Sequence, residues 1–292
     1  MKQLVFLISI PVILWSQDIP KSSTQYGELI VAKFASAAFP DPQRSAGYTY
    51  AGKLYSFDQH YSDSSVAMFI PRGFRKTDTV DLVFHFHGWF NNIDTTIARY
   101  QLARQFTESG KNAILIIPQG SRNVPDSYGG KLEEKDGFKK LVLDVVRYLY
   151  DLKKIKTQQV GRIILSGHSG GGHVEAFILA RGGLTEHVKE VYLFDALYGQ
   201  TEKVVHWIDT YKGKLITMYT DSGGTKEETK SLMADLDSWN VASRACEDVD
   251  CSEAILQQNR FVFLHTMLQH DEVLYAQDAF QKFLQASILD DR

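Results

Sequence analysis

Seven short apolar runs, separated by longer segments of helical periodicity, most constrain how this chain can fold. The runs are residues 65–70, 81–86, 113–117, 162–165, 191–194, 215–219 and 261–264. Most lack a polar face, which is typical of strands covered by helices on both sides of a parallel sheet. The helical spacing is clearest in Phe138, Leu141, Val142, Val145 and Leu149, and again in Val273, Ala276, Phe280, Phe283 and Leu284. This alternation predicts an α/β fold with a mainly parallel sheet and helices on both faces.

The composition limits the classes of partner. The 292 residues are 44% hydrophobic and 23% charged, enough for one large core, and the formal net charge is -3 at pH 7. The basic residues do not cluster into a stripe that follows a phosphate backbone, so nucleic acid is not expected as a partner. In open α/β sheets, ligands bind outside the carboxyl ends of the strands. Reactive residues are therefore expected directly after the apolar runs.

The stretch Gly167-His168-Ser169-Gly170-Gly171 matches the pattern G-x-S-x-G. Three fixed positions recur by accident in about one chain in ten of this length, so the pattern alone is weak. Here it lies between an apolar run and a segment of helical spacing, which is the strand, sharp turn and helix of a nucleophile elbow. A glycine-rich turn without chemistry, or one that binds an anion, is the alternative.

The glycines have a physical reason in such an elbow. A serine at a strained turn needs neighbours without a Cβ two residues before and after it, and Gly167 and Gly171 meet that need. The turn also places the free N–H of Gly170 at a helix start, where it is aimed at negative charge developing on a substrate oxygen.

These residues resemble the α/β-hydrolase superfamily. A second stretch, LVFHFHGW at residues 82–89, is similar to the family's strand that ends in His-Gly. The resemblance implies that the following loop supplies a second N–H to an oxyanion hole, here that of Trp89, while Gly88 lets the chain approach closely. It also implies that His87 tethers this loop. The resemblance covers roughly residues 65–292.

The resemblance further implies a catalytic triad in the chain order serine, acid, histidine. His187 and His206 lie in segments that read as surface. His265 closes the run 261–264, whereas His270 follows it by a short loop and precedes the last helical segment. The family's histidine occupies such a loop, so His270 is preferred as the base and His265 is the alternative.

Two aspartates follow strands downstream of Ser169. Asp221 has the usual family position, but it could instead belong to the cap of a helix beginning near Lys226. Asp195 starts the stretch Asp-Ala-Leu-Tyr-Gly, which resembles a turn in uncharacterised exported bacterial hydrolases. Asp195 is slightly preferred as the acid, and Asp221 stays open as the alternative.

The resemblance implies a serine hydrolase that works without a cofactor or a metal, on a small-molecule or polymeric acyl substrate. An ester is favoured over an amide because the family cleaves esters more often and an alcohol leaves more readily. An amidase or peptidase, or a binding protein without catalysis, would keep the same residues. Residues 196–213 are too few for a large lid, and the insertion at 238–259 is expected to form a cleft wall.

The N-terminus predicts export. Residues 1–17 contain one lysine followed by a short apolar run, which is typical of a signal peptide, although an uncleaved anchor is the alternative. Residues 18–48 are interpreted as an N-terminal extension and 49–292 as the catalytic domain. A secreted or periplasmic location without stable membrane insertion would favour a disulfide between Cys246 and Cys251, with two free thiols as the alternative.

Overall fold

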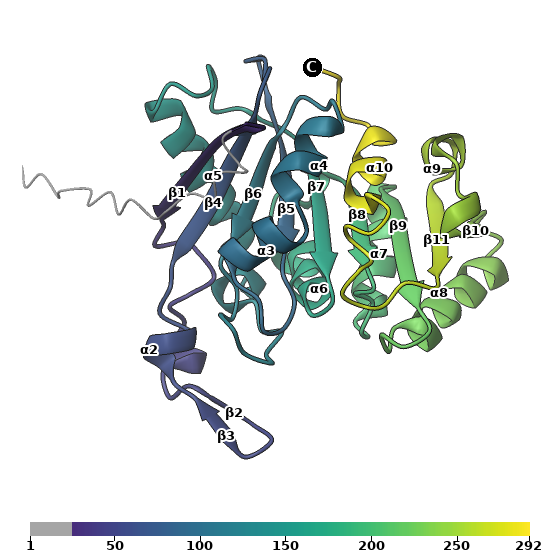
Figure 1. The fold of residues 1–292 in the computed structure, drawn as a ribbon, viewed down its shortest axis with the longest axis horizontal. Coiled ribbons are helices and arrows are strands. Elements are labelled where there is room, and N and C mark those ends of the chain that lie inside the picture. The colour runs from purple at the N-terminus through teal and green to yellow at the C-terminus, as the bar shows by residue number, and fades with distance from the viewer. Residues whose placement is uncertain (1–24) are drawn as a thin grey trace, which may run out of the picture.

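A computed structural model describes residues 25–292, and the predicted signal peptide at 1–17 lies outside them. Its main element is a nine-stranded sheet in the order β1-β4-β6-β5-β7-β8-β9-β11-β10, while β2 and β3 form a separate two-stranded sheet (Figure 1). The strands are β1 (Gly27–Lys33), β2 (Tyr48–Tyr50), β3 (Lys53–Tyr55), β4 (Ser65–Pro71), β5 (Val80–Phe86), β6 (Ile114–Pro118), β7 (Val160–His168), β8 (Val188–Phe194), β9 (Lys214–Thr220), β10 (Arg244–Glu247) and β11 (Phe261–Thr266).

All seven apolar runs form strands of the large sheet, which confirms the α/β class. From β6 to β10 every neighbouring pair is parallel. On the other side of β6, β4 pairs antiparallel with β6, and β1 pairs antiparallel with β4. The edge strands β1 and β10 were not predicted: β10 is largely exposed and carries no continuous apolar run, whereas β1 contains only the short, half-buried apolar run at residues 29–32. β1 lies within the segment interpreted as an N-terminal extension.

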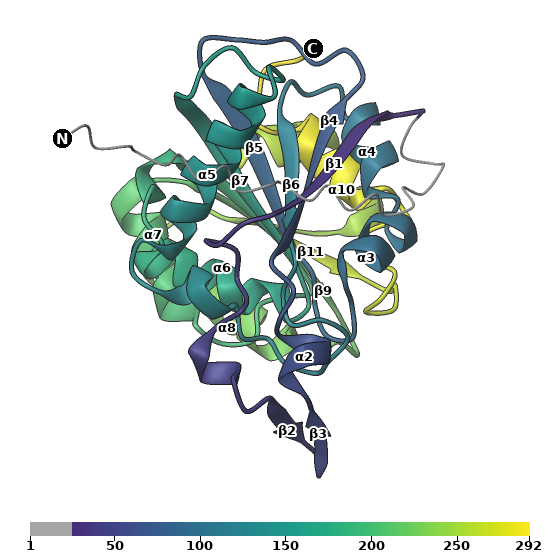
Figure 2. The same ribbon diagram turned by 90° about the vertical axis from the view of Figure 1, so that its left-hand side faces the viewer.

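Helices cover both faces of the sheet, as Figure 2 shows. Apolar residues of α5, α6, α7 and α8 join the core on one face, and those of α3, α4, α9 and α10 join the core on the other. The helices are α2 (Phe57–His60), α3 (Ile93–Arg99), α4 (Leu102–Glu108), α5 (Gly137–Asp151), α6 (Gly171–Arg181), α7 (Thr201–Tyr211), α8 (Lys226–Ser238), α9 (Glu253–Gln258) and α10 (Ala279–Gln285). Short 3-10 turns lie at η1 (Pro42–Arg44), η2 (Gly130–Glu133), η3 (Thr185–His187) and η4 (Asp248–Asp250).

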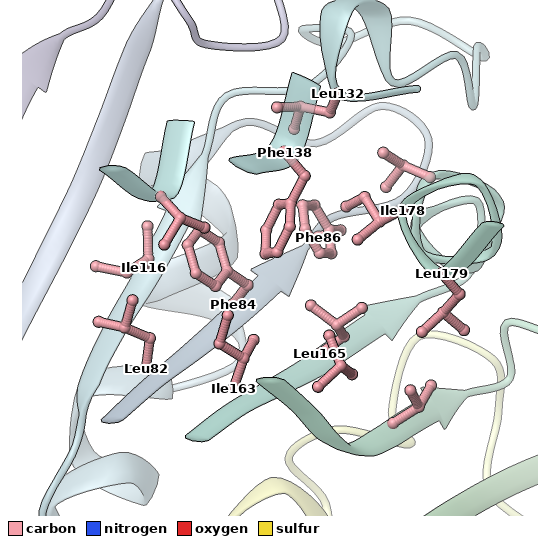
Figure 3. Packing of buried hydrophobic residues seen from close by; sticks show 14 of the residues in the cluster. Leu82, Phe84, Phe86, Ile116, Leu132, Phe138, Ile163, Leu165, Ile178 and Leu179 are labelled. Carbon is pink, nitrogen blue, oxygen red and sulfur yellow. The ribbon is translucent and has the colours of Figure 1, made fainter. Parts of the chain in front are cut away.

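The two cores follow from the two-residue period of the central strands. Leu82, Phe84 and Phe86 of β5 belong to the core beneath α5 and α6, whereas Val83 belongs to the opposite core. Figure 3 shows Phe84 beside Phe138 of α5, and their ring centroids are 4.7 Å apart. Burying each side chain of this size contributes about 1.5 to 3 kcal/mol to stability. No helix among residues 25–292 is both long and apolar enough to span a membrane.

The last helix is shorter than its sequence pattern predicts. The pattern starts at Val273, but α10 begins at Ala279, because Asp278 has a left-handed backbone with φ of 53°. Val273 is nevertheless fully buried, in the turns that precede the helix. The apolar spacing therefore predicts the burial of Val273 correctly, but it predicts the start of the helix incorrectly.

The register of three central strands decides which loops meet. Phe86 of β5 is paired with Gly167 of β7, and His168 of β7 is paired with Phe194 of β8. The segments that follow these parallel strands therefore leave the sheet side by side at the same edge. Between β8 and β9 the chain forms α7 and no lid domain, as expected.

Candidate active site

A sharp turn after β7 holds Ser169 at this edge of the sheet. β7 ends at His168 and α6 begins at Gly171, so Ser169 and Gly170 make the whole turn. Ser169 has φ of 55°, in the left-handed region that residues with a Cβ rarely adopt. Its N–H donates to the carbonyl oxygen of Phe194 at 3.1 Å. The serine is only partly buried and lines a cleft.

Glycines are required around this turn by close backbone contacts. A Cβ on Gly167 would lie 2.9 Å from the backbone carbon of Gly171, across the bend. A Cβ on Gly171 would lie 2.2 Å from the carbonyl oxygen of Phe86. Both distances are shorter than real Cβ contacts, so any larger residue at either position would force the backbone of the turn to move.

The loop after β5 approaches Ser169 equally closely. A Cβ on Gly88 would lie 2.6 Å from the Cβ of Ser169 and 2.9 Å from the carbonyl oxygen of His168. This close approach is the property that the His-Gly resemblance implies for Gly88. The loop therefore lies directly against the turn that carries Ser169.

His87 anchors this loop through hydrogen bonds. Its Nδ1 donates to the carbonyl oxygen of Gly88 at 3.0 Å, and its Nε2 accepts from the N–H of Gly120 at 3.1 Å and from the amide of Gln119 at 3.0 Å. Burial lowers the pKa of His87, against a smaller opposing effect of the bond to Gly88. A neutral imidazole has one donor and one acceptor nitrogen, as these bonds require.

Two backbone N–H groups beside Ser169 are free to bind a ligand. Within residues 25–292, neither the N–H of Trp89 nor that of Gly170 donates to a protein acceptor. The Trp89 side chain is held by a 2.8 Å hydrogen bond from its Nε1 to the hydroxyl of Ser127. Free N–H groups next to a nucleophile are suited to an oxyanion.

His270 lines the same cleft and is hydrogen-bonded to the buried Asp195. His270 follows β11, and its Nδ1 donates to Oδ2 of Asp195 at 2.7 Å. Asp195 directly follows β8, has φ of 46° and is fully buried. With Nδ1 occupied as a donor, the other ring nitrogen of His270 is the one able to accept a proton.

Asp195 is kept ionised by donors from the next strand and helix. Thr220, at the end of β9, donates to Oδ2 at 2.7 Å, and Thr225, the residue before α8, donates to Oδ1. Burial on its own raises the pKa of Asp195, but the hydrogen bonds from His270, Thr225 and Thr220 outweigh it, and the pKa is lowered. Gly223 lies so close to this carboxylate that a Cβ at that position would overlap Oδ2, so only glycine fits there.

His168 joins the turn that carries Ser169 to the loop that carries His270. Its Nε2 donates to the carbonyl oxygen of His270 at 2.9 Å, its Nδ1 accepts from the hydroxyl of Tyr100 at 3.3 Å, and the two imidazole centroids are 4.8 Å apart. Burial and the nearby His270 lower the pKa of His168 to about 4. His168 is therefore neutral at physiological pH, which suits the donor and acceptor roles of its two nitrogens.

Tyr198 lines the same cleft as Ser169. Burial raises the pKa of Tyr198 to about 12, the charge of Asp195 adds to this, and a hydrogen bond with Ser169 acts in the opposite direction. The phenol therefore stays protonated, and it donates to the carbonyl oxygen of Gly223. Tyr198 thus connects the cleft to the loop that surrounds Asp195.

The cleft has a volume of about 470 Å³. Its lining residues are Trp89, Phe90, Asn91, Arg99, Ser127, His168, Ser169, Gly170, Tyr198, His270 and Asp271. The expectation that the insertion at 238–259 forms a cleft wall is wrong, because that segment forms β10, η4 and α9 beyond the β11 edge and supplies none of these residues.

Comparison with known proteins identifies the architecture. No family model matches the chain, and no curated protein matches it. A mutant feruloyl esterase module from Clostridium thermocellum, complexed with sinapinate, is similar with a TM-score of 0.53 at 11% identity, over 98% of this chain and 99% of that chain. A ferulic acid esterase is similar with a TM-score of 0.54 at 12% identity, over 89% of this chain and 98% of that chain. The chain has the α/β-hydrolase fold.

In this fold, the alternative acid, Asp221, and the alternative base, His265, pair with each other. His265 Nε2 lies 3.1 Å from Asp221 Oδ1 and its Nδ1 lies 2.8 Å from Glu247. Asp221 is exposed, and hydrogen bonds from Lys226 and then His265 lower its pKa. Asp221 makes no hydrogen bond to His270 in the described residues, so it does not serve as that histidine's partner in this arrangement.

The two remaining histidines considered from the sequence lie elsewhere. His206 is exposed on α7, and His187 donates from Nδ1 to the carbonyl oxygen of Gly161. Within residues 25–292, His168, His270 and Asp271 place possible metal-ligand atoms within 4.8 Å of one another. Both nitrogens of His168 already have hydrogen-bond partners, and Nδ1 of His270 is bound to Asp195. This group does not fit a metal without breaking those bonds.

Cys246 and Cys251 are free thiols in this structure, so the predicted disulfide is not formed. The two thiols lie close together, and their interaction raises the pKa of Cys246 and lowers that of Cys251. The structure therefore agrees with the alternative of two free thiols and not with the disulfide.

The residues that sequence reasoning missed are those that position others. Thr220 and Thr225 were not recognised as site residues, because threonines are common near strand ends and helix starts. Their partner, Asp195, lies 25 to 30 residues away in sequence. A fixed sequence spacing would not have found them.

Proposed function

We propose that this protein is a serine hydrolase that cleaves carboxylic esters through a Ser169, His270 and Asp195 triad. One observation carries the proposal: the hydrogen bond of His270 to the buried Asp195 lies on the wall of the cleft into which a strained turn presents Ser169. Such an imidazole is held in one tautomer and orientation, as a general base requires.

In the proposed reaction, Oγ of Ser169 attacks the acyl carbon while Nε2 of His270 takes the hydroxyl proton. Asp195 accepts from Nδ1 and stabilises the resulting imidazolium. When the tetrahedral intermediate collapses, the carbon–oxygen bond to the alcohol breaks and His270 returns the proton to the leaving oxygen. Water, deprotonated by the same imidazole, then attacks the acyl-enzyme, releasing the acid and restoring Ser169.

The oxyanion of each intermediate would accept hydrogen bonds from the N–H groups of Gly170 and Trp89, with Gly88 allowing the loop to come this close. Removing one such donor in comparable enzymes costs about 100- to 1000-fold in kcat. Every proton in this sequence moves between groups of the chain, the substrate and water, so the proposal requires no cofactor and no metal.

An ester is preferred over an amide because both similar structures are named as esterases and an alcohol leaves more readily than an amine. The acyl substrate would be a small molecule or the ester group of a polymer, since no lid domain closes the described cleft. An amidase or peptidase, or a binding protein without catalysis, are the alternatives.

The experiment is to treat the purified protein with a fluorophosphonate and locate the adduct by peptide mass spectrometry. The expected result is one adduct on Ser169 that the Ser169→Ala variant lacks. Turnover of an ester and an amide with the same acyl group then separates esterase from amidase. A protein that acquires no adduct and cleaves neither substrate would contradict the enzymatic proposal.

We also propose that the chain is exported, with residues 1–17 as its signal; the catalytic unit includes β1, which pairs with β4 in the main sheet. Expression of the full chain in a bacterium, cell fractionation and N-terminal sequencing would test this. The expected product is extracytoplasmic and begins near Asp18. A full-length product in the cytoplasm would contradict it.

A further inference from the structure

Trp89, which lines the cleft, is one of an exposed pair of aromatic rings. Tyr50 and Trp89 meet edge to face, with ring centroids 5.4 Å apart and an interplanar angle of 70°. Tyr50 is 41% exposed, Trp89 39%, and Phe90, the next residue in the cleft lining, 59%. Large apolar side chains grouped at a binding cleft are more than the scattered exposure that any surface shows.

Tyr50 is supplied by a hairpin that belongs to no part of the main sheet. β2 and β3 pair with Tyr50 opposite Lys53 and Thr49 opposite Leu54, and Figure 1 shows the hairpin projecting from the body of the molecule. Because side chains alternate between faces, Tyr50 and Leu54 lie on opposite faces of the hairpin. Leu54 is 62% exposed, whereas Tyr50 contacts Trp89.

The base of this hairpin is fixed to the cleft. The guanidinium of Arg44 lies over the ring of Tyr48, 5.0 Å from its centroid, and Arg44 Nε bonds Asp126 at 2.7 Å. Asp126 precedes Ser127, the residue that accepts the hydrogen bond from the Trp89 indole. The hairpin, the indole and the cleft wall are thus linked by contacts, so the position of Tyr50 is built into the structure.

We propose that Tyr50 and Trp89 form a subsite for an aromatic group of the substrate. This proposal rests on the proposed ester hydrolysis and names the class of ester. Two rings near a right angle leave a corner in which a third ring can lie with its face on one and its edge toward the other, the arrangements that aromatic side chains prefer. The subsite adjoins the loop after β5 that carries a proposed oxyanion donor, because Trp89 belongs to both.

The test uses ethyl esters of 3-phenylpropanoate, 3-cyclohexylpropanoate and acetate, whose leaving alcohol carries no ring. The first two differ only in the aromaticity of a ring remote from the reacting carbon, so their intrinsic reactivities match. We expect Tyr50→Ala to lower kcat/KM about fivefold for the phenyl ester, and to leave the acetate unchanged. The cyclohexyl ester should lose less than the phenyl ester.

Leu54→Ala is the matched control, because it removes an exposed apolar side chain from the other face of the same hairpin. It should change none of the three values. Tyr50→Phe should behave as the original chain, and Tyr50→Leu, which keeps the apolar bulk, should behave as Tyr50→Ala. Equal losses on all three esters, or the same effect in Leu54→Ala, would overturn the subsite.

A binding measurement separates this proposal from ester hydrolysis itself. In the Ser169→Ala background, calorimetry should show weaker binding of the phenyl ester when Tyr50→Ala is added and unchanged binding when Leu54→Ala is added. This result is expected even if the original chain turns over no ester, an outcome that would refute hydrolysis alone. Equal affinity in all three proteins would overturn the aromatic subsite.

Discussion

Nε2 of His168 lies 2.9 Å from the carbonyl oxygen of His270, a residue 102 positions further along the chain. This hydrogen bond joins the turn that carries Ser169 to the loop that carries the proposed base. It is made by a buried imidazole whose other nitrogen accepts from Tyr100. The relative position of Ser169 and His270 therefore depends on a histidine that takes no part in proton transfer.

Replacing His168 with Gln should flatten the pH dependence of stability. The pKa of His168 is about 4 in the folded protein against an ordinary 6.5, so the unfolded chain binds this proton more readily. Its contribution to the unfolding free energy is complete above pH 6.5 and is lost as the pH falls toward 4. Between pH 7 and pH 5 the original chain should lose about 2 kcal/mol more than His168→Gln.

Urea unfolding at pH 7 and pH 5 measures this difference, and circular dichroism at pH 7 serves as the control for folding. Gln can donate to the carbonyl of His270 and accept from Tyr100, so the variant keeps both bonds without titrating. Parallel losses in the two proteins would contradict a neutral, buried His168.

Asp195→Asn should reduce kcat about 1000- to 10000-fold, because an amide cannot hold the imidazolium as a carboxylate does. Asp221→Asn should leave kcat within about twofold, since Asp221 pairs with Lys226 and His265 at the surface. Ester turnover by both variants at one pH decides between the two aspartates. A large loss in Asp221→Asn with an active Asp195→Asn would reverse the assignment.

Gly88→Ala should reduce kcat by at least about 100-fold, because its Cβ would meet Ser169 and the backbone of His168 and push away the loop that carries a proposed oxyanion donor. Gly73→Ala is the control. Gly73 has φ of 84° but open space around its Cβ position, so alanine there costs about 1 kcal/mol of stability and no activity. Turnover and urea unfolding of the two variants test both statements, and an active Gly88→Ala would refute the close approach.

Thr225→Val should lower kcat and cost about 2 kcal/mol of stability, since it removes a donor from the buried carboxylate of Asp195. Thr225→Ser keeps the hydroxyl and should restore most of the activity. Thr229, one turn later in α8, is equally buried, and its hydroxyl has no partner among residues 25–292. Thr229→Val should therefore be neutral, and similar kinetics in the two valine variants would show that Thr225 does not act on Asp195.

The sequence by itself determined the class of fold and the location of the strained turn. The seven buried strands and the glycines around Ser169 are local patterns, because an apolar run or a missing Cβ acts on the residues beside it. The exposed β10 escaped for the same reason, since an edge strand needs no continuous apolar run, whereas β1 has a short run at residues 29–32 that was not recognised as a strand.

Tertiary structure alone decided which aspartate meets His270, that His168 and two threonines hold this pair, and that Tyr50 reaches Trp89. Asp195 and Asp221 follow neighbouring strands and look alike in sequence. The order and register of β8, β9 and β11 place one under His270 and the other beside His265. Such register arises from packing across the whole sheet, and no short stretch of residues encodes it.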